Sequence, residues 1–288
     1  MELKLQHVTK RYGTKTAVDD INMTLREGIY GLLGANGAGK TSLMRLICLI
    51  QNRSGGEITL DGKEIMELKE EYRSFLGYLP QNFGYYPEFT AQKFLLYMSA
   101  LKGLNKHAAK RRIEELLDVT GLEGDRNKKI KTFSGGMKQR LGIAQAMLND
   151  PHILILDEPT AGLDVMARNE MLDMLRDYME EDEERSILVS SHISTDLETL
   201  CDNIYMINEG NIILHEETDR LLSNYAILKV DEEQSKTLDP QYIIKMKKES
   251  YGYACLTDQK QFYLENYPKI VVEKGTIDQI ITLMIQGV

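Results

Sequence analysis

The sequence predicts an α/β fold built around a phosphate-binding loop, and two short segments carry most of that prediction. The first is Gly34–Thr41, which matches G-x-x-x-x-G-K-[ST] and begins where the apolar run Ile29–Leu33 ends. The second is Ile153–Asp157, in which a run of branched apolar residues leads into an acid. Such runs are typical of strands buried on both faces of a parallel sheet, and ligands bind at the carboxyl ends of such strands. Antiparallel strands predicted at Leu3–Thr9 and Glu57–Leu60 make the sheet region mixed.

The loop at Gly34–Thr41 has the residue types that phosphate binding requires. Glycine has no Cβ atom, so successive backbone N–H groups can point inward, and the positive end of the following helix adds to the attraction. In this pattern Lys40 reaches the β- and γ-phosphates, and the Thr41 hydroxyl binds Mg²⁺. The alternative is a glycine-rich turn that fits by accident, but the apolar run before it and the helical spacing of leucines after it disfavour this. The candidate nucleotide-binding residues are Gly34, Asn36, Gly37, Ala38, Gly39, Lys40, Thr41 and Ser42.

Asp157 and Glu158, at the end of the second apolar run, are the candidate acids. A phosphate-binding loop requires a partner that helps to hold the metal ion. Asp157 fills that role in our interpretation, and Glu158 lies near the expected position of an attacking water. An acid that only caps a buried strand is the ordinary alternative, and the phosphate-binding loop upstream argues against it.

A third segment, Ser134-Gly135-Gly136, comes before the amphipathic stretch Leu141–Leu148. Serine is a favoured helix N-cap, and a helix N-terminus attracts anions. We therefore expect Ser134 to cap a helix and the two glycines to expose a second anion-binding site. Taken alone this signal is weak, because a plain loop before a helix would look the same.

With these segments in this order, the chain resembles the ATPase subunit of the ATP-binding cassette family from Met1 to about Leu222. The resemblance implies the P-loop NTPase cassette fold, with a mixed sheet core and a helical subdomain. It also implies a head-to-tail pair, with a second copy or a paralogous ATPase, in which each ATP lies between the P-loop of one subunit and the Ser-Gly-Gly of the other. The family elements are matched, in family order, by Tyr12, the P-loop, Gln81, Ser134, Asp157-Glu158, Asp164 and His192.

The resemblance also implies a role for each matched residue. Tyr12 stacks on adenine, with a structural tyrosine at a strand end as the alternative. Gln81 joins Mg²⁺ and water to the helical region. Glu158 polarises the attacking water, and His192 contacts the γ-phosphate. The implied catalytic residues are Glu158, His192 and Gln81, the implied metal-binding residues are Thr41, Gln81 and Asp157, and Ser134, Gly135, Gly136 and Asp164 complete the ATP site.

The signature segment departs from the usual Leu-Ser-Gly-Gly-Gln, because Phe133 and Met137 stand at its two ends. Similar versions occur in exporters that have separate membrane subunits. The resemblance therefore implies an ATP-hydrolysing motor subunit of an exporter, with ATP and Mg²⁺ as cofactors and a membrane protein as partner. Amphipathic peptide or antibiotic export is the first expectation. The alternatives are an ion- or polymer-export motor, an importer motor of the same family, or a soluble ATPase that takes no part in transport.

Composition restricts the setting. At 288 residues with 42% hydrophobic content, one to two domains are expected. No apolar run approaches the roughly 18–20 residues that span a bilayer, and Met1–Lys4 does not begin a signal peptide. Cys48, Cys201 and Cys255 are widely spaced, which predicts neither disulfides nor zinc. The net charge of −9 disfavours a nucleic-acid partner. The cysteine usage suits a reducing cytoplasm, and the resemblance implies a location at the cytoplasmic face of the cell membrane.

The chain divides into a cassette at residues 1–223 and a small α+β domain at residues 224–288. The cassette includes a helical subdomain at about residues 82–150, with helices expected at Ala91–Leu101, Ala108–Val119 and Met137–Leu148. By resemblance this subdomain carries a groove for a coupling helix of the membrane subunit. The candidate groove residues are Gly84, Tyr85, Tyr86, Pro87, Phe94, Tyr97 and Met98, with ordinary core packing as the alternative.

The region after Leu222 has short strand-like runs and a final amphipathic helix at Ile277–Ile285. We expect it to have a small core of its own, and the resemblance suggests a dimer-stabilising or regulatory use. The strands are predicted at Ala226–Val230, Tyr242–Met246, Tyr253–Thr257, Gln261–Leu264 and Ile270–Val272. The expected core includes Ile227, Val230, Ile243, Leu256, Val271 and Ile280.

Overall fold

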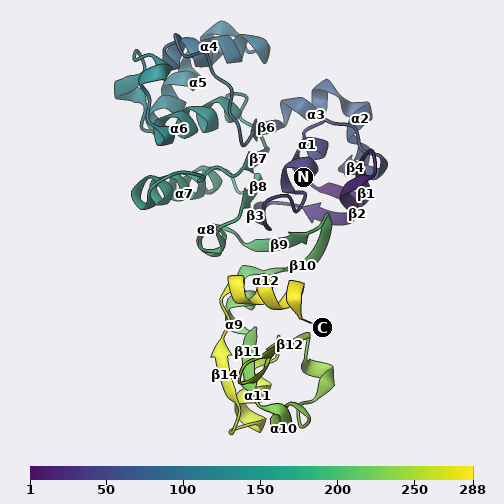
Figure 1. Cartoon of the computed structure of the whole chain (residues 1–288). Helices are drawn as coiled ribbons and strands as arrows, with labels where there is room; N and C mark the ends of the chain where they lie inside the picture. Colours follow the sequence, from purple (N-terminus) through teal and green to yellow (C-terminus); the bar gives the residue numbers. More distant parts are fainter. Residues whose placement is uncertain (288) are drawn as a thin grey trace.

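A computed structural model describes residues 1–287, and its centre is a six-stranded sheet in the order β10-β9-β3-β8-β7-β6 (Figure 1). Strands β6 to β9 and β3 run parallel, and β10 is an antiparallel edge. All residues of β7 and β8 are buried, as the apolar runs predict. The strand bounds are β3 Gly28–Leu33, β6 Leu76–Leu79, β7 Ile153–Asp157, β8 Ser186–Ser191, β9 Asn203–Asn208 and β10 Asn211–Glu217.

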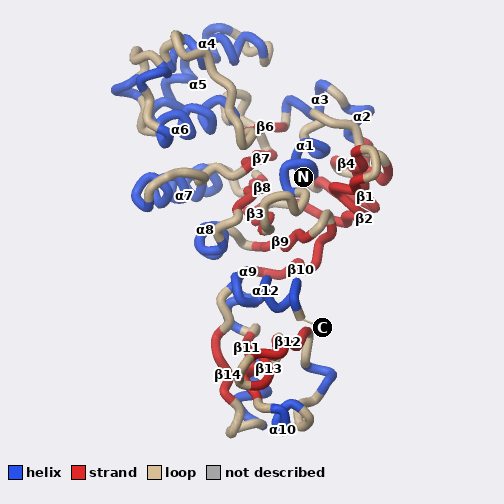
Figure 2. The backbone as a smooth tube through the Cα atoms, in the orientation of Figure 1, coloured by secondary structure: helices blue, strands red, loops and turns tan. Residues whose placement is uncertain are grey.

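A second, antiparallel sheet contains the two predicted N-terminal strands in the order β2-β1-β4-β5 (Figure 2). The antiparallel pairing is confirmed, but these strands form a separate sheet and do not extend the six-stranded one. Helix α1 (Lys40–Ile47) packs between both sheets, because its apolar side chains share one core with residues of each. The strand bounds are β1 Leu3–Tyr12, β2 Lys15–Leu25, β4 Gly55–Leu60 and β5 Lys63–Glu64, and the short helices α2 (Ile65–Leu68) and α3 (Glu70–Ser74) follow.

The helical subdomain consists of α4 (Ala91–Leu101), α5 (Lys106–Val119) and α6 (Gly135–Ala146). The predicted bounds of α4 are confirmed. Helix α5 begins two residues earlier than predicted, because the Asn105 side chain caps it by accepting from the His107 N–H at 2.9 Å. Helix α6 also begins two residues early, since Ser134 is its N-cap and both glycines lie in its first turn.

Helices α7 (Val165–Glu180) and α8 (Ser194–Leu200) share one core cluster with residues of the six-stranded sheet. Leu172 and Leu175 of α7 and Leu197 of α8 belong to this cluster, together with Leu154 of β7 and Val189 of β8. Helix α8 follows β8 after His192 and Ile193, whereas the loop Glu158–Asp164 joins β7 to α7. None of the helices within residues 1–287 is long and apolar enough to cross a membrane.

The C-terminal region forms a four-stranded sheet in the order β12-β13-β11-β14. Two strand predictions are wrong. Gln261–Leu264 is helical, because Tyr263 packs in the core from helix α11. Tyr242 lies in a 3₁₀ turn that begins with Pro240, so the strand predicted to begin at Tyr242 begins at Lys245. The bounds are α9 Thr218–Ser223, β11 Ala226–Val230, α10 Glu232–Ser235, β12 Lys245–Glu249, β13 Gly252–Thr257, α11 Lys260–Asn266, β14 Val271–Lys274 and α12 Ile277–Gln286.

The expectation that this region has a core wholly of its own is wrong. Val230 and Ile243 do pack in a small local core, but Ile227, Leu256 and Ile280 belong to the cluster that includes the cassette residues of α8. Val271, also predicted in the core, is 55% exposed. Helix α12 packs on α8 and on its own sheet, and Figure 1 shows it at the junction of the two parts. The C-terminal sheet is therefore attached to the cassette through buried apolar side chains.

Candidate nucleotide-binding site

A cavity of about 460 Å³ lies over the phosphate-binding loop. Four segments meet there: the turn between β1 and β2, the loop before α1, the residue Gln81 after β6, and Glu158 after β7. Lys15 and Ala17 of β2 also line the cavity and were not predicted, since no motif includes them. The cavity is lined by Tyr12, Lys15, Ala17, Ala35, Asn36, Gly37, Gly39, Lys40, Thr41, Ser42, Gln81 and Glu158.

Two glycines of the loop have no room for a side chain. Gly39 has a φ of +116°, and a Cβ atom there would lie 2.4 Å from the Ala17 carbonyl oxygen. A Cβ atom on Gly34 would lie 2.4 Å from the Ile207 carbonyl oxygen. The loop is therefore held tightly against β2 and β9, and α1 starts directly after it with no acid in its first turn. This helix end offers unpaired N–H groups and a positive dipole to an anion.

Lys40 is the buried cation of the site, with 6% of its surface exposed. Its Nζ atom donates to the Gly34 carbonyl at 2.5 Å and lies 3.1 Å from Oε1 of Glu158. Sequence reasoning assigned each residue to phosphate or water, and it did not predict that the two form an ion pair. The pair forms because the loop after β3 and the end of β7 lie at the same edge of the sheet.

Glu158 is the central acid, and only 3% of its surface is exposed. Its Oε2 atom is hydrogen-bonded to Nδ1 of His192 at 2.6 Å, so the carboxylate lies between Lys40 and the imidazole. The backbone of Glu158 is left-handed, with a φ of +54°. Such a conformation costs about 1–3 kcal/mol in a residue with a side chain and is held by surrounding contacts.

Asp157 is fully buried beside this acid. The Ser190 hydroxyl donates to Oδ1 of Asp157 at 2.8 Å and accepts from the Glu158 N–H at 2.9 Å. The other oxygen, Oδ2 of Asp157, is buried and has no hydrogen-bond partner among the described residues. Ser190 was missed in the sequence, although its place two residues before His192 was a usable signal.

The signature residues lie apart from this cavity. The Ser134 hydroxyl caps α6 by accepting from the Met137 N–H at 3.2 Å, which confirms its predicted capping. Asp164 caps α7 by accepting from the Ala167 N–H at 2.9 Å. Gly136 lies near Leu163, so the two helix starts are neighbours. Within one chain, the structure does not bring Ser134, Gly135, Gly136 or Asp164 to the P-loop.

A parallel sheet, a phosphate-binding loop and a buried acid pair beside it define a nucleotide-binding P-loop protein. The family profile described as "ABC transporter" matches residues 18–161. The chain is 38% identical to the ABC transporter ATP-binding protein NatA of Bacillus subtilis (strain 168), over 68% of this chain and 80% of that protein. It is also 38% identical to the bacitracin transport ATP-binding protein BcrA of Bacillus licheniformis, over 73% of this chain and 68% of that protein.

Among solved structures, the chain is similar to the dimeric structure of MJ0796, a bacterial ABC transporter cassette. The TM-score is 0.68 at 26% identity, over 75% of this chain and 98% of that one. The chain therefore belongs to the ABC transporter family. It binds and hydrolyses ATP as the ATPase subunit of such a transporter.

Tyr12 offers a test of the base-binding end of the cavity. The residue is 43% exposed, its hydroxyl is hydrogen-bonded to Gln51, and it lines the cavity with the P-loop. If the ring stacks on adenine, Tyr12→Ala is expected to weaken ATP binding by about 1–3 kcal/mol, and Tyr12→Trp to restore it. Titration with a fluorescent ATP analogue measures this, with Tyr251→Ala, another exposed tyrosine, as the control. Unchanged affinity in Tyr12→Ala would leave Tyr12 a structural residue.

Proposed function

We propose that this chain hydrolyses ATP by in-line attack of water in the cavity, with Glu158 as the residue that polarises the water. The observation that carries the proposal is the contact of the buried Glu158 carboxylate with both Lys40 and His192. Lys40 is held by carbonyl and carboxylate oxygens, which are the kind of partners that a γ-phosphate oxygen would replace. Catalysis of this type depends on positioning and charge stabilisation, and it forms no covalent enzyme intermediate.

The residues around Asp157 fit a magnesium ion. Oxygen ligands suit Mg²⁺, which is bound in such sites by one or two side chains together with phosphate oxygens. The unpartnered Oδ2 of Asp157 is an available carboxylate oxygen, and Thr41 and Gln81 line the neighbouring cavity. When bound, the ion would neutralise charge on the β- and γ-phosphates. In this proposal Asp157, Thr41 and Gln81 hold it.

We propose further that two cassettes pair head to tail and enclose ATP between them. The separation of Ser134 from the P-loop within one chain supports this, because only a second subunit could then place its signature segment at the nucleotide. Ser134, Gly135 and Asp164 are exposed. Beside them Val165 and Met166 are 69% and 74% exposed, and adjacent exposed apolar side chains are typical of an interaction surface.

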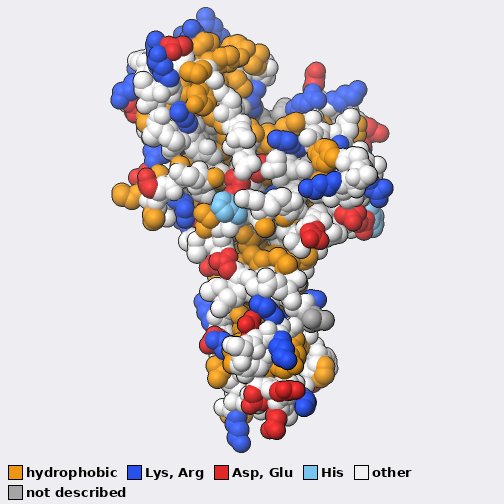
Figure 3. All heavy atoms as spheres, viewed as in Figure 1, with side chains coloured by type: hydrophobic (Ala, Val, Ile, Leu, Met, Phe, Trp, Pro, Cys, Tyr) orange, Lys and Arg blue, Asp and Glu red, His pale blue; other side chains and the backbone are white. Residues whose placement is uncertain are grey.

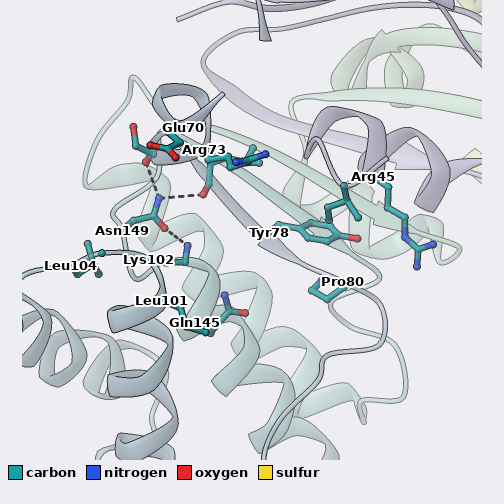
Figure 4. Close-up of a pocket in the computed structure, with 14 residues that line it drawn as sticks. Arg45, Glu70, Arg73, Tyr78, Pro80, Leu101, Lys102, Leu104, Gln145 and Asn149 are labelled. Atoms are coloured by element: carbon teal, nitrogen blue, oxygen red, sulfur yellow. Dashed lines mark hydrogen bonds between the residues drawn. The ribbon is translucent and has the colours of Figure 1, made fainter. Parts of the chain in front are cut away.

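The membrane subunit has a candidate docking site in a groove of about 970 Å³ between the cassette core and the helical subdomain (Figure 4). The predicted groove residues are not its lining. Phe94 is buried in the core, as the alternative of ordinary core packing predicted. Tyr86 and Tyr97 are exposed and pack edge to face against each other. The groove is lined by Arg45, Ile50, Glu70, Arg73, Ser74, Leu76, Tyr78, Pro80, Leu101, Lys102, Gly103, Leu104, Gln145 and Asn149.

The chemistry of this groove suits an amphipathic segment with an acidic side chain. Arg45, Arg73 and Lys102 outnumber Glu70, while Leu101 offers exposed apolar surface. Burial lowers the pKa of Lys102 to about 8, and its ammonium group is hydrogen-bonded to Asn149. Tyr78 lines the groove beside Arg45, and burial raises the pKa of its hydroxyl to about 12.

Hydrophobic side chains also gather on the surface of the helical subdomain around α4, as Figure 3 shows. We propose that this end of the molecule faces the membrane subunit and that the chain is a peripheral protein of the cytoplasmic membrane face. The proposed cargo class is amphipathic peptides or antibiotics. Its support is the similarity to BcrA, whose name assigns it to bacitracin transport.

We also propose the domain division after Ser223, where α9 ends and the C-terminal sheet begins.

Affinity capture of the tagged chain from detergent-solubilised membranes tests the proposed partner. An integral membrane protein is expected to co-purify, and Lys102→Glu is expected to lower its yield at least several-fold by placing a like charge against an acidic segment. Lys110→Glu, an exposed lysine of α5 outside the groove, is the matched control. Capture of ribosomes in place of a membrane protein would contradict the proposed transport role, and equal loss in both variants would contradict the groove.

A further inference from the structure

A buried carboxylate outside the cavity, that of Asp196, connects the two catalytic segments. Asp196 lies in the first turn of α8 and is almost fully buried. Its Oδ2 atom accepts a hydrogen bond from the Thr160 hydroxyl at 2.6 Å, and Thr160 is equally buried. Its Oδ1 atom lies 3.6 Å from Nη1 of Arg168 in α7. No motif of the sequence includes either Asp196 or Thr160.

The positions of Thr160 and Asp196 in the chain show which segments their hydrogen bond connects. Thr160 is two residues beyond Glu158 and belongs to the loop that ends at Asp164, the cap of α7. Asp196 is four residues beyond His192 and lies in the helix that follows it. The hydrogen bond therefore joins the loop that carries Glu158 and Asp164 to the segment that carries His192.

Beyond Glu158, whose contacts are described above, the other hydrogen bonds of this loop among the described residues are local. Within it, the Ala161 N–H donates to the Glu158 carbonyl and the Leu163 N–H to the Thr160 carbonyl, both at 3.2 Å. Ser190 fixes its start by accepting from the Glu158 N–H. The Thr160–Asp196 bond is the corresponding side-chain anchor on the far side of Glu158. A hydrogen bond between a hydroxyl and a carboxylate is short and roughly twice as strong as a neutral one.

We infer that Asp196 is a positioning residue for ATP hydrolysis, which acts through Thr160 to hold the Glu158–Asp164 loop against the His192 segment. The inference rests on the proposed roles of Glu158 and His192. Neither Asp196 nor Thr160 lines the cavity, so we expect neither to contact ATP bound on the P-loop. Loss of the anchor displaces the loop, and a displacement on the order of 1 Å lowers a catalysed rate by about 100-fold.

The test compares Thr160→Val, which keeps the shape and removes the donor, with Thr160→Ser, which restores the hydroxyl. In Thr160→Val the Asp196 carboxylate keeps the positive charge of Arg168 beside it, so we expect the variant to fold. Thermal unfolding checks this expectation. The kcat of Thr160→Val is expected to fall about 10- to 100-fold with the Kd for ATP within about twofold of wild type. Thr160→Ser is expected to regain most of the rate.

A double-variant cycle and a control complete the experiment. Asp196→Asn is expected to lower kcat less than Asp196→Ala, because it keeps an acceptor, and Asp196→Ala is expected to add little in the Thr160→Val background. Glu198→Gln, on the same helix, is the control. Wild-type kcat in folded Thr160→Val, or parallel loss of kcat and ATP affinity, would overturn the inference. An inactive wild-type enzyme would instead overturn the proposed function.

Discussion

Replacing Glu158 by Gln is expected to lower the steady-state ATPase rate by roughly 10²–10⁴-fold, the usual contribution of a positioned acid–base group. The substitution keeps the size of a side chain that is only 3% exposed, so the surrounding packing is retained. It removes the negative charge that Lys40 and His192 now face. ATP binding on the P-loop is expected to remain, because the glycine loop and the α1 N-terminus do not depend on this carboxylate.

Phosphate release measures the rate, and titration of a fluorescent ATP analogue measures affinity. Glu180→Gln, which removes an exposed carboxylate at the end of α7, is expected to behave like wild type. A Glu158→Gln enzyme that turns over ATP at near the wild-type rate would remove Glu158 from the mechanism.

Replacing Lys40 by Met is expected to have the next largest effect, this time on binding. Hydrogen bonds to charged groups are worth about 1.5–3 kcal/mol, so loss of the ammonium group should weaken ATP binding by roughly 10- to 150-fold. The same change leaves Glu158 buried without its cation, and breaking such a pair costs about 3–5 kcal/mol of stability. Calorimetric titration and urea unfolding measure the two effects.

The double variant Lys40→Met, Glu158→Gln separates these effects. Because no unpaired charge remains buried, it is expected to recover much of the lost stability while ATP binding stays weak. Lys63→Met, an exposed lysine of β5, controls for the loss of a positive charge. Wild-type ATP affinity in Lys40→Met would contradict the phosphate role, and an additive loss of stability would contradict the ion pair.

The parts of the fold that the sequence predicted are those with strong local patterns. The buried strand Ile153–Asp157 and the helix Ala91–Leu101 have the predicted bounds. The failures lie where local preference and packing disagree. Gln261–Leu264 is rich in aromatic residues, which favours a strand, yet packing of Tyr263 against the C-terminal sheet makes it a helix. The separate antiparallel sheet depends on how α1 fills the space between two layers, which no short pattern reports.

In the candidate site, too, local motifs were predictable and contacts between distant segments were not. Contiguous motifs placed Gly39, Lys40 and Glu158 correctly at one cavity. Contacts across strands were not predictable, because they depend on which strands are neighbours. The ion pair of Lys40 with Glu158 and the hydrogen bond of Thr160 with Asp196 are of this kind. The residues predicted for the groove do not line the cavity that we propose as the docking site, because its lining comes from segments that are far apart in the chain.

The central claim is that ATP is held between two copies of this cassette, and sedimentation of the Glu158→Gln chain with ATP and Mg²⁺ tests it most directly. Slow hydrolysis should keep ATP in place, so the predicted result is a species of twice the 32.9 kDa chain mass, formed with ATP and lost with ADP. Adding Gly136→Glu, which places a negative charge in the signature segment, should abolish this ATP-dependent dimer. A Glu158→Gln chain that binds ATP yet sediments as a monomer at every nucleotide concentration would contradict the account.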